Sequence, residues 1–262
     1  QIIQRQLEQD GVKILLNAAS TQIARTAAGK TIQIDLQGKQ SEIIVDEILI
    51  STGRAPNVQG LNLEQAGVKY DEREGVFVNN YLQTTNSAIY AAGDICSRYQ
   101  FTHTADFQAR IVIGNALFKG RSKSSNLLIP WCTYTEPEIA HVGLYEHEAA
   151  AKNIRIQTFI QELKDVDRAI LDAETNGFVK IHVKQGSDKI LGATIVASHA
   201  GDLISEISVA MQSGMGLKKL ASVIHPYPTQ ADAIRKIGDQ YNRTRLSPLV
   251  KSIFNKWLTW SR

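Results

Sequence analysis

Cysteine is almost absent from this sequence, which has only Cys96 and Cys132 among its 262 residues. The two lie too far apart in the chain to make a redox or metal-binding motif, and two cysteines cannot build a disulfide framework. We interpret both as small core or near-core side chains, and we expect a reducing compartment, the cytoplasm.

Long apolar runs and a strong charge of one sign are absent too. No apolar run reaches the length of about 18 residues that a transmembrane helix needs. The formal net charge of +3 is too small to indicate a nucleic-acid partner. The first residues, Gln1 to Arg5, lack the apolar core of a signal peptide. What remains is the composition of a globular protein, with 43% hydrophobic and 21% charged residues.

Apolar periodicity predicts the elements of the fold. The chain begins without methionine, inside a helical pattern, so we expect a piece of a longer protein. Segment 41–52 is nearly continuously apolar and is predicted to be a buried central strand. The predicted helices are 1–10, 104–118, 144–152, 201–213, 217–222, 230–242 and one after Pro248. The predicted strands are 12–18, 31–36, 41–52, 75–79, 88–95, 131–135, 139–142, 154–162, 177–184 and 189–198.

Four segments resemble one family, in the same order and spacing. They are ILISTGRAPN at 48–57, TTNSAIYAAGDI at 84–95, YTEPEIAHVG at 134–143 and HPYPTQAD at 225–232. Together they resemble the C-terminal part of the FAD-dependent pyridine nucleotide–disulfide oxidoreductases, and the last segment is most similar to the mercuric-reductase subgroup. The resemblance covers roughly residues 1–240 and is carried by four motifs rather than by one.

The resemblance implies a fold of mixed class, α/β plus α+β. Partial Rossmann-like dinucleotide-binding domains would precede an interface domain with an antiparallel sheet flanked by helices. The expected ranges are 1–52 for the end of the NAD(P)-binding domain, 53–120 for the end of the FAD-binding domain, 127–245 for the dimerisation domain and 246–262 for an amphipathic tail. The basic, serine-rich stretch 119–126 is the expected boundary before the interface domain.

An FAD site is implied at the end of the second motif. Gly93 would let the cofactor approach the backbone, and the Asp94 carboxylate would accept hydrogen bonds from the ribityl chain. A helix start beneath the flavin would stabilise negative charge on the reduced ring through its N–H groups. The residues expected there are Thr102, His103, Thr104 and Ala105, with His103 alternatively a polar residue at a helix start.

The first motif implies contacts with NAD(P)H. Gly53 would allow close approach of the dinucleotide. For Arg54 two interpretations stay open, a contact with the cofactor and a structural ion pair.

The last motif departs from the family pattern at its catalytic position. Disulfide reductases have His-Pro-Thr there, followed by two residues and Glu, and the histidine reaches across a dimer interface. Here Tyr227 replaces that histidine, Asp232 replaces the glutamate, and His225 lies two residues earlier. A phenol with a pKa of about 10 donates a hydrogen bond but is a poor base at neutral pH.

We therefore expect Tyr227 to help bind an acceptor without relaying a proton. Asp232 either orients a catalytic group or forms a capping box with Thr229. His225 either serves as a substitute acid or stays outside the catalytic position.

The reaction that the resemblance implies moves electrons from NAD(P)H through FAD and a Cys-x4-Cys pair to an acceptor. This sequence has neither glycine-rich dinucleotide turn nor that pair, so alone it is expected to be inactive and without cofactors. The expected partners are a second copy and a small-molecule or metal-ion acceptor, with no resident metal site. No cysteine follows Cys132, which argues against a true mercuric reductase and leaves dihydrolipoamide dehydrogenase-like and soluble transhydrogenase-like activities open. A non-catalytic dimerisation module is the alternative from another class.

An apolar stripe marks the tail. It is flanked by Lys251, Lys256 and Arg262, and its members are Leu249, Val250, Ile253, Phe254, Trp257 and Leu258. Two interpretations are open, docking onto its own domain and a weak contact with a membrane surface.

Overall fold

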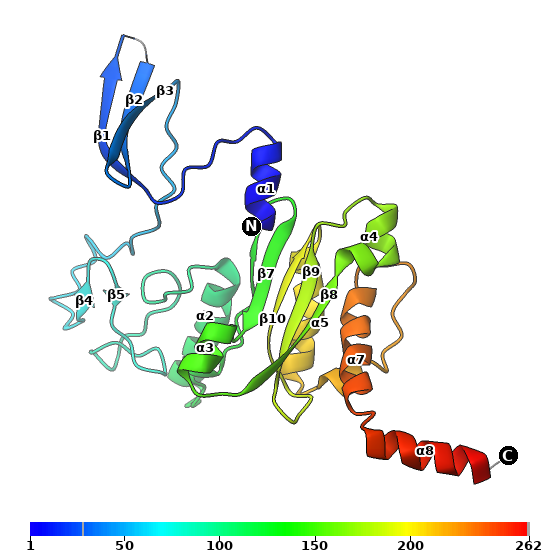
Figure 1. Ribbon diagram of the computed structural model, residues 1–262. Coiled ribbons are helices and arrows are strands. Elements are labelled where there is room, and N and C mark those ends of the chain that lie inside the picture. Colours follow the sequence, from blue (N-terminus) through cyan, green and yellow to red (C-terminus); the bar gives the residue numbers. More distant parts are fainter. Residues whose placement is uncertain (28, 261–262) are drawn as a thin grey trace. The chain divides into compact units, whose positions relative to one another are not determined.

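The computed structural model describes residues 1–27 and 29–260 (Figure 1). The chain packs as two compact units that divide after residue 100, with residue 2 grouped with the second. The finer domain ranges expected from the sequence stay predictions. Each unit has a core of its own, a small one around Val58, Val68 and Val76 and a large one in the second unit.

The first unit begins with a helix and a meander of three strands. Helix α1 spans Ile2–Gln9, close to its prediction, and β1 (Ala18–Thr26), β2 (Gly29–Leu36) and β3 (Lys39–Val45) form an antiparallel sheet in the order β1-β2-β3. Gly38, with a φ of +87°, makes the turn between β2 and β3 and donates its N–H to Asp35 Oδ1 at 2.6 Å. Local turn chemistry thus sets the register of this hairpin.

Two strand predictions at the start of this unit differ from the structure: 12–18 is wrong except for Ala18, and 41–52 is correct only as far as Val45. The segment 12–18 is irregular, and the strand begins only at Ala18. Segment 41–52 leaves the ladder after Val45, where the last pair joins Lys30 to Val45, and Leu49 and Ile50 are 91% and 71% exposed. Among the described residues no strand pairs with the stretch after Val45. An apolar run predicts a buried strand only where a neighbouring strand exists to cover it.

The rest of the first unit is largely irregular. Strands β4 (Tyr70–Asp71) and β5 (Gly75–Val76) have two residues each. The strand predicted at 75–79 therefore forms only over its first two residues. The strand predicted at 88–95 is also wrong, because only an isolated bridge joins Tyr90 to Gln83. A Cβ on Gly75 would lie 2.1 Å from the carbonyl oxygen of Ile95, so this glycine lets two backbone segments pass closely.

The second unit is built on a five-stranded antiparallel sheet (Figure 1). The strand order is β6-β7-β10-β9-β8, and a hairpin turn at 185–188 joins β9 to β10. The predicted antiparallel sheet is thereby confirmed. The strands are β6 (Trp131–Thr133), β7 (Glu138–Gly143), β8 (Ile156–Glu162), β9 (Phe178–Lys184) and β10 (Ile190–Ala197).

Helices flank this sheet. Helix α5 packs against β7 and β10, and α7 packs against β8 and β9. Ile195 of β10, Ile207 of α5 and Ile234 of α7 are fully buried where these layers meet. The helices are α2 (Thr102–Leu117), α3 (Glu146–Ala151), α4 (Asp167–Leu171), α5 (Ala200–Gln212), α6 (Leu217–Leu220), α7 (Asp232–Thr244) and α8 (Pro248–Trp260). All of these helices except α4 were predicted to within a few residues. In the described part of the chain, no helix is long and apolar enough to cross a membrane.

Candidate functional site

In the first unit, the structure brings together two residues that the sequence assigned to different cofactors. Arg54 Nη1 lies 3.4 Å from Asp94 Oδ2 and donates to the carbonyl oxygen of Gln100 at 2.9 Å. Of the two interpretations of Arg54, the ion pair is therefore present. Both side chains are at least half exposed, so the pair stabilises the fold by no more than about 1 kcal/mol.

The two glycines of this site adopt conformations that other residues rarely take. The φ angles are +127° for Gly53 and +81° for Gly93. Gly93 is buried, and its carbonyl oxygen accepts the N–H of Cys96 at 3.1 Å. No described atom lies within 4 Å of the point where a Cβ on Gly53 would sit, which leaves room for a ligand beside the backbone.

In the second unit, the predicted flavin-contact residues form the first turn of α2. Phe101 is the N-cap residue and provides no side-chain cap, so N–H groups of this turn have no partner from the cap. The His103 ring donates from Nε2 to the carbonyl oxygen of Pro130 at 2.8 Å and stacks on Phe101. His103 thus has the contacts of a structural residue at a helix start.

Thr104 is the unusual member of this turn. Its side chain is 1% exposed, and its Oγ1 has no hydrogen-bond partner among the described residues. A buried hydroxyl without a partner is uncommon and costs about 1–3 kcal/mol. Together with the uncapped helix start, it provides donors for a group that carries negative charge, so the residues present fit the edge of a reduced flavin ring.

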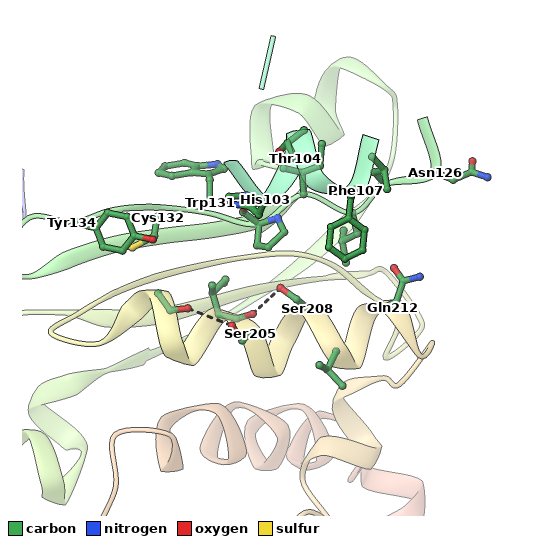
Figure 2. Close-up of a pocket in the computed structure, with 17 residues that line it drawn as sticks. His103, Thr104, Phe107, Asn126, Trp131, Cys132, Tyr134, Ser205, Ser208 and Gln212 are labelled. Carbon is green, nitrogen blue, oxygen red and sulfur yellow. Dashed lines mark hydrogen bonds between the residues drawn. The ribbon is translucent and has the colours of Figure 1, made fainter. Parts of the chain in front are cut away.

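A cavity of about 530 Å³ opens beside this turn, between α2 and α5 (Figure 2). It has the size of a cofactor or ligand pocket. Its walls come from His103, Thr104 and Phe107 of α2, from Trp131, Cys132 and Tyr134 around β6, and from Ser205, Ser208 and Gln212 of α5. Ser205 and Ser208 donate their hydroxyls to carbonyl oxygens of their own helix, which leaves an apolar wall of aromatic and aliphatic groups.

Neither cysteine has the character of a nucleophile. Burial raises the pKa of the Cys96 thiol to about 11. Burial and the carboxylate of Glu138, whose Oε2 lies 3.7 Å from Sγ, raise the pKa of Cys132 to about 11 as well. Both are free thiols and stay protonated at neutral pH, where only a thiolate attacks.

Tyr227 lies on an exposed loop between two prolines, and 74% of its surface is accessible. Its hydroxyl donates to Oδ2 of Asp167, the first residue of α4, at 2.8 Å. This hydrogen bond and the charge of Asp167 raise the pKa of Tyr227. The phenol is therefore a hydrogen-bond donor at neutral pH and a poor base. Asp167 was missed in the sequence, because no motif contains it.

His225 has a carboxylate partner, but not the expected one. Its Nε2 lies 2.8 Å from Oε1 of Glu206 in α5, and its Nδ1 lies 3.0 Å from the carbonyl oxygen of Val223. The side chain is 6% exposed, so both nitrogens are engaged inside the unit. Glu206 gave no signal in the sequence, since it stands inside an ordinary helical pattern.

The capping box predicted for Thr229 and Asp232 is wrong. Helix α7 begins at Asp232 itself, with Ala231 as the N-cap residue, and the Thr229 hydroxyl donates to the carbonyl oxygen of Pro226 at 2.8 Å. Asp232 accepts a hydrogen bond from Arg235 Nε at 2.8 Å. Among the described residues no hydrogen bond joins it to Tyr227 or His225, so its partners are basic groups of its own helix.

A polar hollow of about 640 Å³ lies beside the tyrosine loop. Gln230 donates from Nε2 to Glu174 Oε2 at 2.6 Å, while its Oε1 is buried without a partner in the described structure. Arg168, Asp172 and His199 add polar groups to the wall. The residues after Tyr227 therefore line a hollow that can accept a ligand with hydrogen-bond donors.

Comparison with known proteins covers nearly the whole chain. Residues 1–109 match the pyridine nucleotide-disulphide oxidoreductase domain, and residues 129–237 match the dimerisation domain of the same family. A mercuric reductase from Staphylococcus aureus is 36% identical over 233 residues, which are 89% of this chain and 43% of that protein. A dihydrolipoyl dehydrogenase from Thermus scotoductus is 30% identical over 246 residues, 92% of this chain and 52% of that protein.

Solved structures agree with this assignment. LpdA from Mycobacterium tuberculosis superimposes with a TM-score of 0.82 at 28% identity, over 92% of this chain and 52% of that one. The HOCl-induced flavoprotein disulfide reductase RclA from Escherichia coli gives 0.81 at 26% identity, over 91% and 54%. The chain spans about half the length of the curated relatives it matches. It belongs to the pyridine nucleotide-disulphide oxidoreductase family, whose members depend on FAD and NAD(P)H.

Proposed function

We propose that this chain is part of a mercuric-reductase-like flavoenzyme that moves electrons from NAD(P)H to an acceptor through FAD and a cysteine pair outside this sequence. The observation that carries the proposal is Tyr227, an exposed hydrogen-bond donor with a raised pKa where disulfide reductases have a histidine. Mercuric reductases that are 36% and 32% identical to this chain support the same subgroup.

Within this proposal, the residues of the chain bind and orient the flavin. Bound FAD supplies the hydride and electron chemistry. The first turn of α2, with Thr104, would face the part of the ring that becomes negative. Asp94 would accept hydrogen bonds from the ribityl chain, and Arg54, which pairs with it, would hold that carboxylate in place. Gly53 would leave room for NAD(P)H beside the protein backbone.

A metal ion or a small molecule is the proposed acceptor. Tyr227 would hold it through its hydroxyl, without taking or giving a proton. Two kinds of relative support a metal ion, the mercuric reductases and RclA, which has been solved as a Cu(II) complex. Dihydrolipoyl dehydrogenases are also relatives, but a dithiol substrate needs a base that titrates near neutrality, which a phenol does not provide.

The second unit is the proposed dimer contact, since residues 129–237 match a dimerisation domain. As an isolated chain it would then be a dimerisation module without catalytic activity. A solution mass measurement on this chain tests the module, and a monomer at micromolar concentration would reject it. We also propose the cytoplasm as its location, where both free thiols stay reduced.

The acceptor is tested on the complete enzyme that contains this chain. NADPH oxidation is measured with Hg²⁺, Cu²⁺, a disulfide and a quinone, for the wild type and for Tyr227→Phe and Tyr227→His. We expect the metal ions to support turnover, and Tyr227→Phe to lower it by about tenfold through loss of one hydroxyl contact. Efficient turnover of the disulfide alone, unchanged in Tyr227→Phe, would reject the proposal. Tyr227→His is the matched variant that restores the imidazole of the disulfide reductases.

A further inference from the structure

The last helix presents an apolar surface to solvent. In α8 the tail face consists of Val250, Ile253, Phe254, Trp257, Leu258 and Trp260. From Ile253 onward these side chains are between 47% and 86% exposed, with Trp260 the most exposed. From Ile253 onward the tail face is therefore open to solvent, which argues against docking onto its own domain, one of the two interpretations of the tail. The side chain of Leu249 and residue Arg262 lie outside the described part of the chain.

Helical geometry gathers these residues on one side. At about 100° per residue, positions 250, 253, 254, 257 and 258 recur along one stripe, and Trp260 extends its edge. The opposite side carries Ser252, Asn255 and Thr259, which are polar and uncharged. An exposed apolar side of this width needs a cover, because isolated exposed residues are ordinary but a continuous patch marks an interaction surface.

The two lysines of the helix mark the borders of the tail face. Lys251 lies three residues before Phe254 and seven before Leu258, which places it along one edge. Lys256 lies three residues after Ile253 and four before Trp260, along the other edge. After Asp239 the sequence contains no acidic residue and five Lys or Arg residues. The helix is thus cationic on both sides of an apolar stripe.

Pairing of the tail face with the tail face of a second copy would be unfavourable. When two such helices pair through their apolar stripes, the border positions of one oppose those of the other. Here every charged residue within α8 is a lysine, so paired helices would bring like charges together. With 13 residues α8 is also too short to span a bilayer, which takes about 20.

We propose that α8 lies flat in the surface of an anionic membrane. The tail face would enter the boundary of headgroups and acyl chains, with Trp257 and Trp260 at the interface. Lys251 and Lys256 would reach the lipid phosphates on either side. This contact is independent of the proposed acceptor, and it would hold the chain at a membrane surface by one helix.

The test is co-sedimentation of the 262-residue chain with vesicles. Phosphatidylglycerol–phosphatidylcholine vesicles are compared with vesicles of phosphatidylcholine alone. We expect binding to the anionic vesicles, weakened by salt, with a blue shift of tryptophan emission. Phe254→Ser with Trp257→Ser should lower partitioning by more than about tenfold. Lys251→Gln with Lys256→Gln should lower it by about thirtyfold on anionic vesicles only.

Asn255→Ser with Thr259→Ser is the matched control on the polar side of α8, and it should bind like the wild type. Circular dichroism checks that all variants keep the fold. Vesicle binding that deletion of residues 247–262 leaves unchanged would overturn the proposal. So would a change of solution mass in the tail-face variant without any vesicle binding, because that result assigns the surface to a second copy.

Discussion

At the scale of single residues, the proposed acceptor site differs from the disulfide-reductase pattern in the group that it presents. Tyr227 presents a protonated hydroxyl, and Asp167 holds it in place from a part of the chain 60 residues away. The imidazole of His225 points instead to Glu206 and is buried. His225 and Tyr227 are therefore close together in the sequence but have different surroundings in the fold. The histidine is buried beside Glu206, and the tyrosine is exposed beside Asp167.

The contact between Tyr227 and Asp167 predicts a titration effect. Replacement of Asp167 by Asn removes the carboxylate charge and its acceptor role, so the pKa of Tyr227 should fall towards its ordinary value. The measurement is an NMR titration of tyrosine labelled at Cζ, with the signal assigned by Tyr227→Phe. Asp172→Asn serves as the control, since Asp172 pairs with Arg168 and not with the phenol. An unchanged Tyr227 titration in Asp167→Asn would show that the hydrogen bond does not exist in solution.

At the scale of elements, the antiparallel sheet of the second unit holds most of the core. Ile195 in β10 is completely buried, whereas Ile160 in β8 is 43% exposed. Glu138, at the start of β7, accepts the N–H of Gly201 at 2.8 Å and so serves the start of α5. This carboxylate therefore has a structural role.

The contrast between the two isoleucines gives a stability prediction. Ile195→Ala should lower the free energy of unfolding by about 2–5 kcal/mol, because it removes buried methyl groups and leaves a cavity. Ile160→Ala, the matched control in the same sheet, should cost less than about 1.5 kcal/mol, since its side chain is partly hydrated already. Urea unfolding of this chain measures both. Equal losses would contradict the assignment of β10 to the centre of the core.

Element prediction from the sequence succeeded where the pattern was local. Helices α5 and α7 and strands β7 to β10 follow from periodicity, because each buries apolar side chains against neighbours within the same unit. It failed for 12–18, for the second half of the strand predicted at 41–52, and for 88–95, where apolar residues suggested strands. Pairing requires a second strand at hydrogen-bonding distance, and an apolar run contains no information on that partner.

At the scale of the whole molecule, two buried histidines couple folding to pH. His141 hydrogen-bonds to Thr194 Oγ1 and to the carbonyl oxygen of Gly143, and His182 hydrogen-bonds to Thr158 Oγ1. Burial lowers the pKa of both imidazoles. For His182, the carboxylate of Glu146 partly opposes this effect and Lys180 adds to it. The folded chain therefore favours the neutral form of both rings.

The sign of the pH effect follows from these lowered pKa values. As the pH falls below the unfolded pKa of about 6.5, the unfolded chain binds protons that the folded chain does not. The free energy of unfolding should consequently fall between about pH 7 and pH 5, as measured by urea unfolding at a series of pH values. His182→Gln should flatten this slope, and replacement of the exposed His147 is the matched control. A slope that is the same in His182→Gln would contradict the prediction for that residue.

The sequence by itself determined the family, the sheet and most helices of the second unit, and the tyrosine at the position where the family pattern has a histidine. These depend on local pattern and on motifs, which a linear chain carries in full. Only the tertiary structure decided the partners, namely Asp167 for Tyr227, Glu206 for His225 and Asp94 for Arg54. It also decided that the tail helix is exposed. Contacts between distant residues arise only when the chain packs, because packing brings together side chains that no sequence spacing relates.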